Sequence, residues 1–167
     1  MVPGQFENGS FESDYKMRKL GIVLLLTIGW GDLKASDDKV AQWIETIRSV
    51  GAQGSGSQEA RAARIQLAGR GPEILLDLLV GMDTPDIVSS NWLRSVFDEI
   101  VDRTWARNPK LIPEQELHDF FIDSRREGRV RRLALSVLAR QDPEFPERMI
   151  PGLVEDPEFR FDAIDHL

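Results

Sequence analysis

A chain of 167 residues is long enough for one domain with its own hydrophobic core. Its 21 basic and 28 acidic residues give a net charge of −7, which disfavours a nucleic-acid-binding protein, because phosphate neutralisation by Lys and Arg supplies most of that affinity. It contains no cysteine, so disulfides and thiolate metal sites are excluded. Helix-forming residues are abundant, and no stretch alternates apolar and polar residues long enough to indicate a strand. We therefore expect an all-α protein.

The amino-terminal region is typical of an export signal. Arg18 and Lys19 form a short basic region, residues 20–30 form an apolar run, and the small residue Ala35 precedes a possible cleavage site. The run is shorter than the roughly 20 residues that a transmembrane helix needs. We expect a signal peptide over residues 17–35, a periplasmic or secreted protein, and no membrane association after the signal is removed.

Residues 1–16 are polar and acidic, which is unusual ahead of such a signal. We expect them to be a disordered, over-extended gene start, with translation beginning at Met17. The alternative is a cytoplasmic protein in which the apolar run is a buried helix. Three glycines within and beside the run, at Gly21, Gly29 and Gly31, make that helix a poor one.

The rest of the chain is predicted to be a succession of amphipathic helices. An amino-terminal helix and a Gly/Ser linker account for residues 36–56, with Gly51 as the stop of the helix. Ser57 is the expected N-cap of the next helix, which stops at Gly69. Proline near helix starts and apolar residues at helical spacing predict the later helices. These cover residues 72–82, 85–107, 113–127, 129–140, 142–156 and 157–167.

A spacing pattern repeats along these helices, with two intervals of four residues. It occurs as Glu59-Ala63-Leu67, Val130-Ala134-Leu138 and Phe159-Ala163-Leu167, with Val88-Trp92-Val96 as a weaker fourth. The interval from Ala63 to Trp92 and that from Ala134 to Ala163 are both 29 residues, the length of one helical pair with tight turns.

The segments "RVRRLALSVL" and "EFRFDAIDHL" resemble the first helix of a HEAT repeat, and "RMIPGLVEDP" resembles its second helix. "EARAARIQLAGRGPEILLDLL" resembles a full pair, whereas the pair over residues 84–127 departs from the pattern in length. Residues 57–167 are thus similar to HEAT-repeat proteins of the short HEAT-like, bacterial secreted type. The resemblance implies an α-solenoid of about three to four helical hairpins, the last incomplete, that binds or scaffolds proteins without catalysis.

The resemblance also implies a binding surface, because the second helices of this family line the concave side. The corresponding ranges are residues 73–79, 114–123 and 147–154. The acidic residues expected there are Glu114, Glu116, Asp119 and Asp123, and they would suit a basic protein partner. The alternative is an enzyme, since some HEAT-like proteins are alkylpurine DNA glycosylases or bilin lyases. The acidic charge and the export signal disfavour it.

The last predicted helix places Phe159, Ile164 and Leu167 on one face. With no second helix to cover this face, we expect the three side chains to remain partly exposed. The natural chain would then continue past Leu167, or this end would dock on a partner. The alternative is that the helix lies back on the preceding pair.

Polar residues give little indication of chemistry. On a helix, Glu114 and His118 share one face, and Asp119 and Asp123 share another. Neither pair gives the three or four convergent ligands that a metal site needs. We therefore predict a solvated face, no metal and no cofactor. The tryptophans are expected in the core. A basic cluster is expected to pair with acidic residues across a repeat junction, although it could bind an anionic partner. Its members are Arg125, Arg126, Arg129, Arg131 and Arg132.

Overall fold

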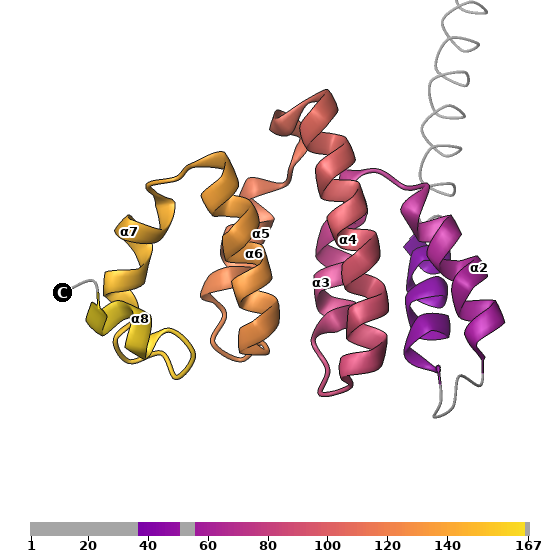
Figure 1. Cartoon of the computed structure of the whole chain (residues 1–167), viewed down its shortest axis with the longest axis horizontal. Helices are drawn as coiled ribbons and strands as arrows, with labels where there is room; N and C mark the ends of the chain where they lie inside the picture. Colours follow the sequence, from indigo (N-terminus) through magenta and orange to yellow (C-terminus); the bar gives the residue numbers. More distant parts are fainter. Residues whose placement is uncertain (1–36, 51–55, 166–167) are drawn as a thin grey trace, which may run out of the picture. The chain divides into compact units, whose positions relative to one another are not determined.

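The computed structural model describes residues 37–50 and 56–165, and all regular secondary structure in these ranges is helical (Figure 1). The predicted all-α class is therefore confirmed. Val40–Leu167 form one compact unit, and a separate unit covers Met1–Lys39. The predictions for the gene start and the signal peptide lie outside the described residues.

The helices follow the predicted order closely. A helix over residues 37–48 is followed by α2 (Ser57–Ala68), the 3₁₀ segment η2 (Pro72–Ile74), α3 (Leu75–Met82), α4 (Ile87–Arg107), η3 (Pro109–Leu111), α5 (Glu114–Ile122), α6 (Gly128–Gln141), α7 (Phe145–Met149), η4 (Ile150–Leu153) and α8 (Arg160–Asp165). Helices close in sequence pack together: α3 on α4, α5 on α6, α2 on α4, and α8 on η4 (Figure 1).

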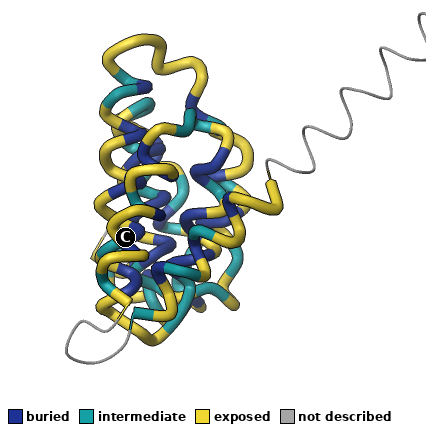
Figure 2. The backbone as a smooth tube through the Cα atoms, turned by 90° about the vertical axis from the view of Figure 1, so that its right-hand side faces the viewer, coloured by how far each residue is buried: buried dark blue, intermediate teal, exposed yellow. Residues whose placement is uncertain are grey.

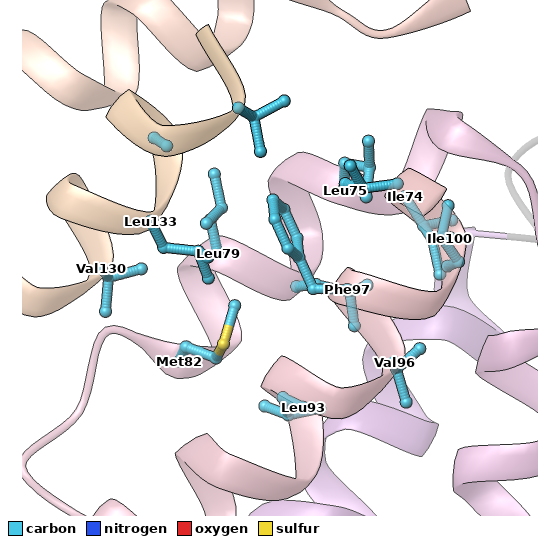
Figure 3. Packing of buried hydrophobic residues seen from close by; sticks show 14 of the residues in the cluster. Ile74, Leu75, Leu79, Met82, Leu93, Val96, Phe97, Ile100, Val130 and Leu133 are labelled. Carbon is cyan, nitrogen blue, oxygen red and sulfur yellow. The ribbon is translucent and has the colours of Figure 1, made fainter. Parts of the chain in front are cut away.

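One hydrophobic core runs through these helices. Leu79 of α3 and Phe97 of α4 are fully buried, and Leu133 of α6 packs close to Leu79 (Figure 3). The helix over residues 37–48 adds Ile47 to the same core. Figure 2 shows buried positions on the inner sides of the helices and exposed positions along their outer sides and at the turns. Burying each such side chain stabilises the fold by about 1.5–3 kcal/mol.

The buried face of α4 differs from the predicted one. The sequence pattern placed Val88 and Trp92 inward, but Val88 is 55% exposed and Trp92 is only partly buried. The predicted Val96 is buried, and the rest of the inner stripe consists of Ser89, Ser90, Leu93, Phe97, Ile100, Val101 and Thr104. The small serines allow a close approach to α3, where the Ser90 hydroxyl donates to the carbonyl of Met82 at 3.4 Å.

Helix α5 ends five residues earlier than predicted, at Ile122 instead of residue 127. The Asp123 side chain accepts a hydrogen bond from the backbone N–H of Arg125 at 3.2 Å, which favours a turn over another helical residue. The carbonyl of Phe121 accepts from Nε of Arg131 at 2.7 Å. The Arg131 side chain therefore satisfies one of the carbonyls that the end of the helix leaves open.

The expectation that Phe159 remains partly exposed is wrong, because its side chain is fully buried. Its ring packs edge-on against Phe121 with 5.2 Å between the ring centroids, and the Arg131 guanidinium lies 4.9 Å above it. The turn before α8 is what directs Phe159 inward, since the Asp156 carboxylate accepts the Phe159 N–H at 3.3 Å. Ile164 is 51% exposed, and Leu167 lies outside the described residues.

Candidate functional site

The arginine cluster is mainly a set of structural contacts. Arg131 is 1% exposed, and its guanidinium donates to both carboxylate oxygens of Asp156 at 3.0 and 2.7 Å. Its Nε atom donates to the Phe121 carbonyl, so one side chain from α6 joins the end of α5 to the turn before α8. Asp156 also accepts the N–H of Glu158 at 3.0 Å. The predicted pairing of this arginine with an acidic residue is confirmed.

Other members of the cluster also have partners. Arg126 pairs with Asp83 at 3.1 Å, and Arg132 pairs with Asp162 at 2.7 Å. Arg129 instead donates to a backbone carbonyl, that of Thr84. These contacts link segments 30 to 45 residues apart in sequence.

The acidic residues predicted for binding lie on and just after α5, and two of them open the helix. Glu114 and Glu116 are in the first turn, where the partial positive charge of the helix N-terminus favours carboxylates. Both side chains are exposed, and neither forms an ion pair within the described part of the chain. Their charges therefore remain available to a partner.

Asp119 lies one turn further along α5 and is also exposed. Its carboxylate accepts a hydrogen bond from the Gln115 amide at 2.9 Å and lies 3.4 Å from Nδ1 of His118. The His118 ring packs edge-on against Phe145 of α7, with centroids 5.9 Å apart. Asp119 is thus held by neutral or weakly basic neighbours and adds its charge to the same helix.

Asp123 differs from the other three carboxylates because it is already neutralised. Arg125 donates to both of its oxygens at 2.8 and 3.0 Å, and Arg126 donates at 3.2 Å. The hydrogen bonds from the Arg125 side chain hold the pKa of Asp123 well below its usual range. We define the α5 acidic surface as Glu114, Glu116 and Asp119, and Asp123 belongs to the turn that ends the helix.

Two hollows meet at Glu114. One, of about 270 Å³, is lined by Glu114, Gln115, His118 and Phe145. The other, of about 390 Å³, is lined by Trp105, Pro109, Lys110, Ile112, Glu114 and Gln141. Each therefore combines the Glu114 carboxylate with an aromatic side chain. The first hollow has no Lys or Arg in its lining and so attracts a cation, whereas the second already contains Lys110 and the Trp105 ring beneath the Arg140 guanidinium.

The linings of these hollows could not be predicted from the sequence. Trp105, Gln141 and Phe145 come from α4, α6 and α7, and no local motif connects them with α5. Trp105 was expected in the core, but it is only partly buried, and the Arg140 guanidinium lies 4.5 Å from its ring. Among the lining residues, Glu114 and His118 carried a recognisable signal, as polar residues on the solvated face of a predicted helix.

Some kinds of site are absent from the part of the chain that the structure describes. Within residues 37–50 and 56–165, no three His, Asp or Glu side chains are grouped so that they could hold a metal ion. Within the same ranges, no helix is long and apolar enough to cross a membrane. Comparison with known proteins adds no relative: no family model, no curated protein and no solved structure matches the chain.

Proposed function

We propose that this chain is a helical-repeat scaffold that binds a basic protein through the α5 acidic surface, without catalysis of its own. The observation that carries the proposal is the exposure of Glu114 and Glu116 without ion pairs, next to hollows that each contain an aromatic ring. A lysine or arginine side chain that enters the hollow lined by Glu114, His118 and Phe145 would meet the carboxylate and the rings together.

The proposed architecture is an α-solenoid of the HEAT-like type. Its support is that helices pack on their neighbours in the chain, and that the repeated small residues Ala63, Ala134 and Ala163 are all buried where helices meet. In such a fold each hairpin buries its apolar face against neighbouring hairpins, which leaves the helices that line the concave side free to carry a binding surface.

The test is capture of partners by wild-type and variant chains. The binding variant carries Glu114→Gln, Glu116→Gln and Asp119→Asn. A matched control removes the same charge at three other exposed positions, Glu59, Glu155 and Asp165. Each purified chain is used as bait in an extract of the native cells, and captured proteins are quantified by mass spectrometry.

We expect the wild type and the control to capture the same basic proteins, and the binding variant to lose them. Capture by wild type should also fall as salt is raised, because exposed charges are screened over about 10 Å at moderate ionic strength. Equal capture by the binding variant and the control would show that α5 is not the binding surface.

Export remains a proposal carried by the sequence pattern alone. The basic residues and the apolar run that precede Ala35 support removal of a signal peptide before Ser36. Amino-terminal sequencing of the protein from its native cells tests this, and a chain that retains Met17 and the apolar run in full would contradict it.

A further inference from the structure

Another hollow, apart from the two at Glu114, combines apolar and cationic side chains. It measures about 210 Å³ and lies where the end of α3 meets the first turns of α4 and α6. Its lining consists of Met82, Ile87, Ser90, Asn91, Arg94, Arg129, Val130 and Leu133. None of these lining residues is acidic, although the chain has 28 carboxylate side chains.

The apolar part of the hollow is continuous with the core, yet open to solvent at one side. Val130 and Leu133 face Met82 across the base (Figure 3). At the rim Ile87 is 61% exposed. An apolar side chain therefore stands in water at the entrance of an apolar depression, where a partner's side chain could cover it.

The cationic part consists of two guanidinium groups with weak or no carboxylate partners. Arg94 has Asp98 at 3.6 Å, and both side chains are at least half exposed, so that pair contributes little. Arg129 donates to the Thr84 carbonyl and forms no salt bridge in the described ranges, and its buried Nε–H has no acceptor there.

One carboxylate outside the lining needs to be considered. A hydrogen bond with the Ser89 side chain, and to a smaller extent the charge of Arg129, lowers the pKa of Asp86. The Asp86 oxygens are nevertheless engaged, since they accept the N–H groups of Val88 and Ser89 at 3.0 and 3.3 Å as the N-cap of α4. Asp86 therefore stabilises the helix start and leaves the two guanidinium groups with unused donors.

We infer that this hollow docks an acidic, amphipathic segment of a partner protein, one apolar side chain filling the depression while flanking carboxylates pair with Arg94 and Arg129. Size favours a peptide over a small molecule, because ligand sites for drug-sized molecules measure about 300–1,000 Å³ and this hollow holds little more than one large side chain. Charge favours an acidic segment, since bidentate pairing with carboxylates is the interaction that guanidinium groups make best. The surface is distinct from the α5 acidic surface and opposite to it in charge.

The test uses short synthetic peptides with blocked ends. The first has a central Leu-Phe pair between glutamates, the second has the same pair between lysines, and the third has Ala-Ala between glutamates. Binding is followed by changes in the backbone amide signals of the isotope-labelled full chain. We expect the first peptide to bind at least about tenfold more tightly than the other two, with shifts centred on Asn91, Arg94 and Leu133.

Two variants and a matched control locate the binding. Ile87→Ala and Arg94→Glu change exposed side chains and should each weaken the first peptide by at least about tenfold. Ile65→Ala and Arg61→Glu make the same changes on the exposed face of α2 and should leave binding within about twofold. The amide spectra of all four variants verify that the chain remains folded.

Four results would overturn the inference. They are equal or tighter binding of the lysine peptide, equal binding of the Ala-Ala peptide, shifts centred away from α4 and α6, and no shifts with any of the peptides. Tight binding of a fatty acid such as decanoate at the same amides, without binding of the first peptide, would replace a protein partner with a lipid and would also reject it.

Discussion

The buried ion pair between Arg131 and Asp156 gives the most stringent test of how this fold is held together. Its side chains are 1% and 6% exposed, and the pair is bidentate. Asp156→Asn removes the charge but keeps an oxygen that can accept the Glu158 and Phe159 N–H groups. The guanidinium is then left buried without a counter-charge, which costs about 3–5 kcal/mol.

That loss is a large part of the roughly 5–15 kcal/mol by which a domain of this kind is stable. Urea unfolding followed by circular dichroism measures it as a lower midpoint at unchanged slope. The control is Asp102→Asn, which breaks the exposed pair with Arg140 at 2.6 Å and should cost less than about 1 kcal/mol. A similarly small loss for Asp156→Asn would refute the reasoning, because it would mean that water reaches the guanidinium.

The same pair should make the fold sensitive to acid. The hydrogen bonds from Arg131 lower the pKa of Asp156 below its usual 3.8. Because the folded-state pKa is depressed, the stability it contributes is fully present above the ordinary pKa and is lost as the pH falls through the folded-state pKa. The stability difference between wild type and Asp156→Asn, measured by urea unfolding, should therefore shrink below about pH 4. A stability difference between wild type and Asp156→Asn that stays constant into strong acid would contradict the lowered pKa of Asp156.

Three further changes are expected to affect stability, each measurable by urea unfolding. Phe159→Ala should cost about 3–5 kcal/mol because the ring is fully buried. Phe161→Ala changes a 77% exposed position and should cost less than about 0.5 kcal/mol. Equal losses of stability in the two variants would place Phe159 at the surface. Gly81→Ala should destabilise the fold by about 1 kcal/mol despite the better helix propensity of alanine. The new methyl group would lie 2.6 Å from Cγ2 of Ile44, and this β-branched side chain cannot rotate away. A gain in stability would show that α3 and the helix over residues 37–48 can separate. Asp86→Ala should lower the urea midpoint at neutral pH but much less in strong acid. The pKa of this N-cap carboxylate is lowered in the fold, so the stability that it contributes is lost as the pH falls. A difference in midpoint between wild type and variant that does not change with pH would contradict this prediction.

Local features of the fold could be predicted from the sequence because short-range physics determines them. Prolines and glycines located most helix ends, as Gly69 does for α2 and Pro72 for the 3₁₀ segment before α3. The capping residue of α2 was misplaced by one position, since Gly56 and not Ser57 precedes the first helical residue. Such errors are small because adjacent residues can take the same role.

Features that depend on distant segments could not be predicted in the same way. The pattern of α4 predicted Val88 on the inner face, but the helix packs on α3 with Ser89 and Ser90 buried instead. Burial of Phe159 depends on Phe121 and Arg131, both more than twenty residues away. The same holds for the candidate site. The exposed carboxylates of α5 could be predicted from the helical pattern, whereas the pairing of Asp123 with two arginines depends on a turn that the pattern did not predict.

The contacts of Arg131 also determine how the carboxyl-terminal part of the domain opens. Since its guanidinium binds both the Phe121 carbonyl and Asp156, the turn that carries Glu158 cannot loosen while α6 remains in place. The end of α5, helix α6 and the turn before α8 therefore form one cooperative unit for hydrogen exchange rather than a gradient of fraying toward the carboxyl end. The last helix, though short, is thereby protected by a side chain of a helix almost thirty residues before it.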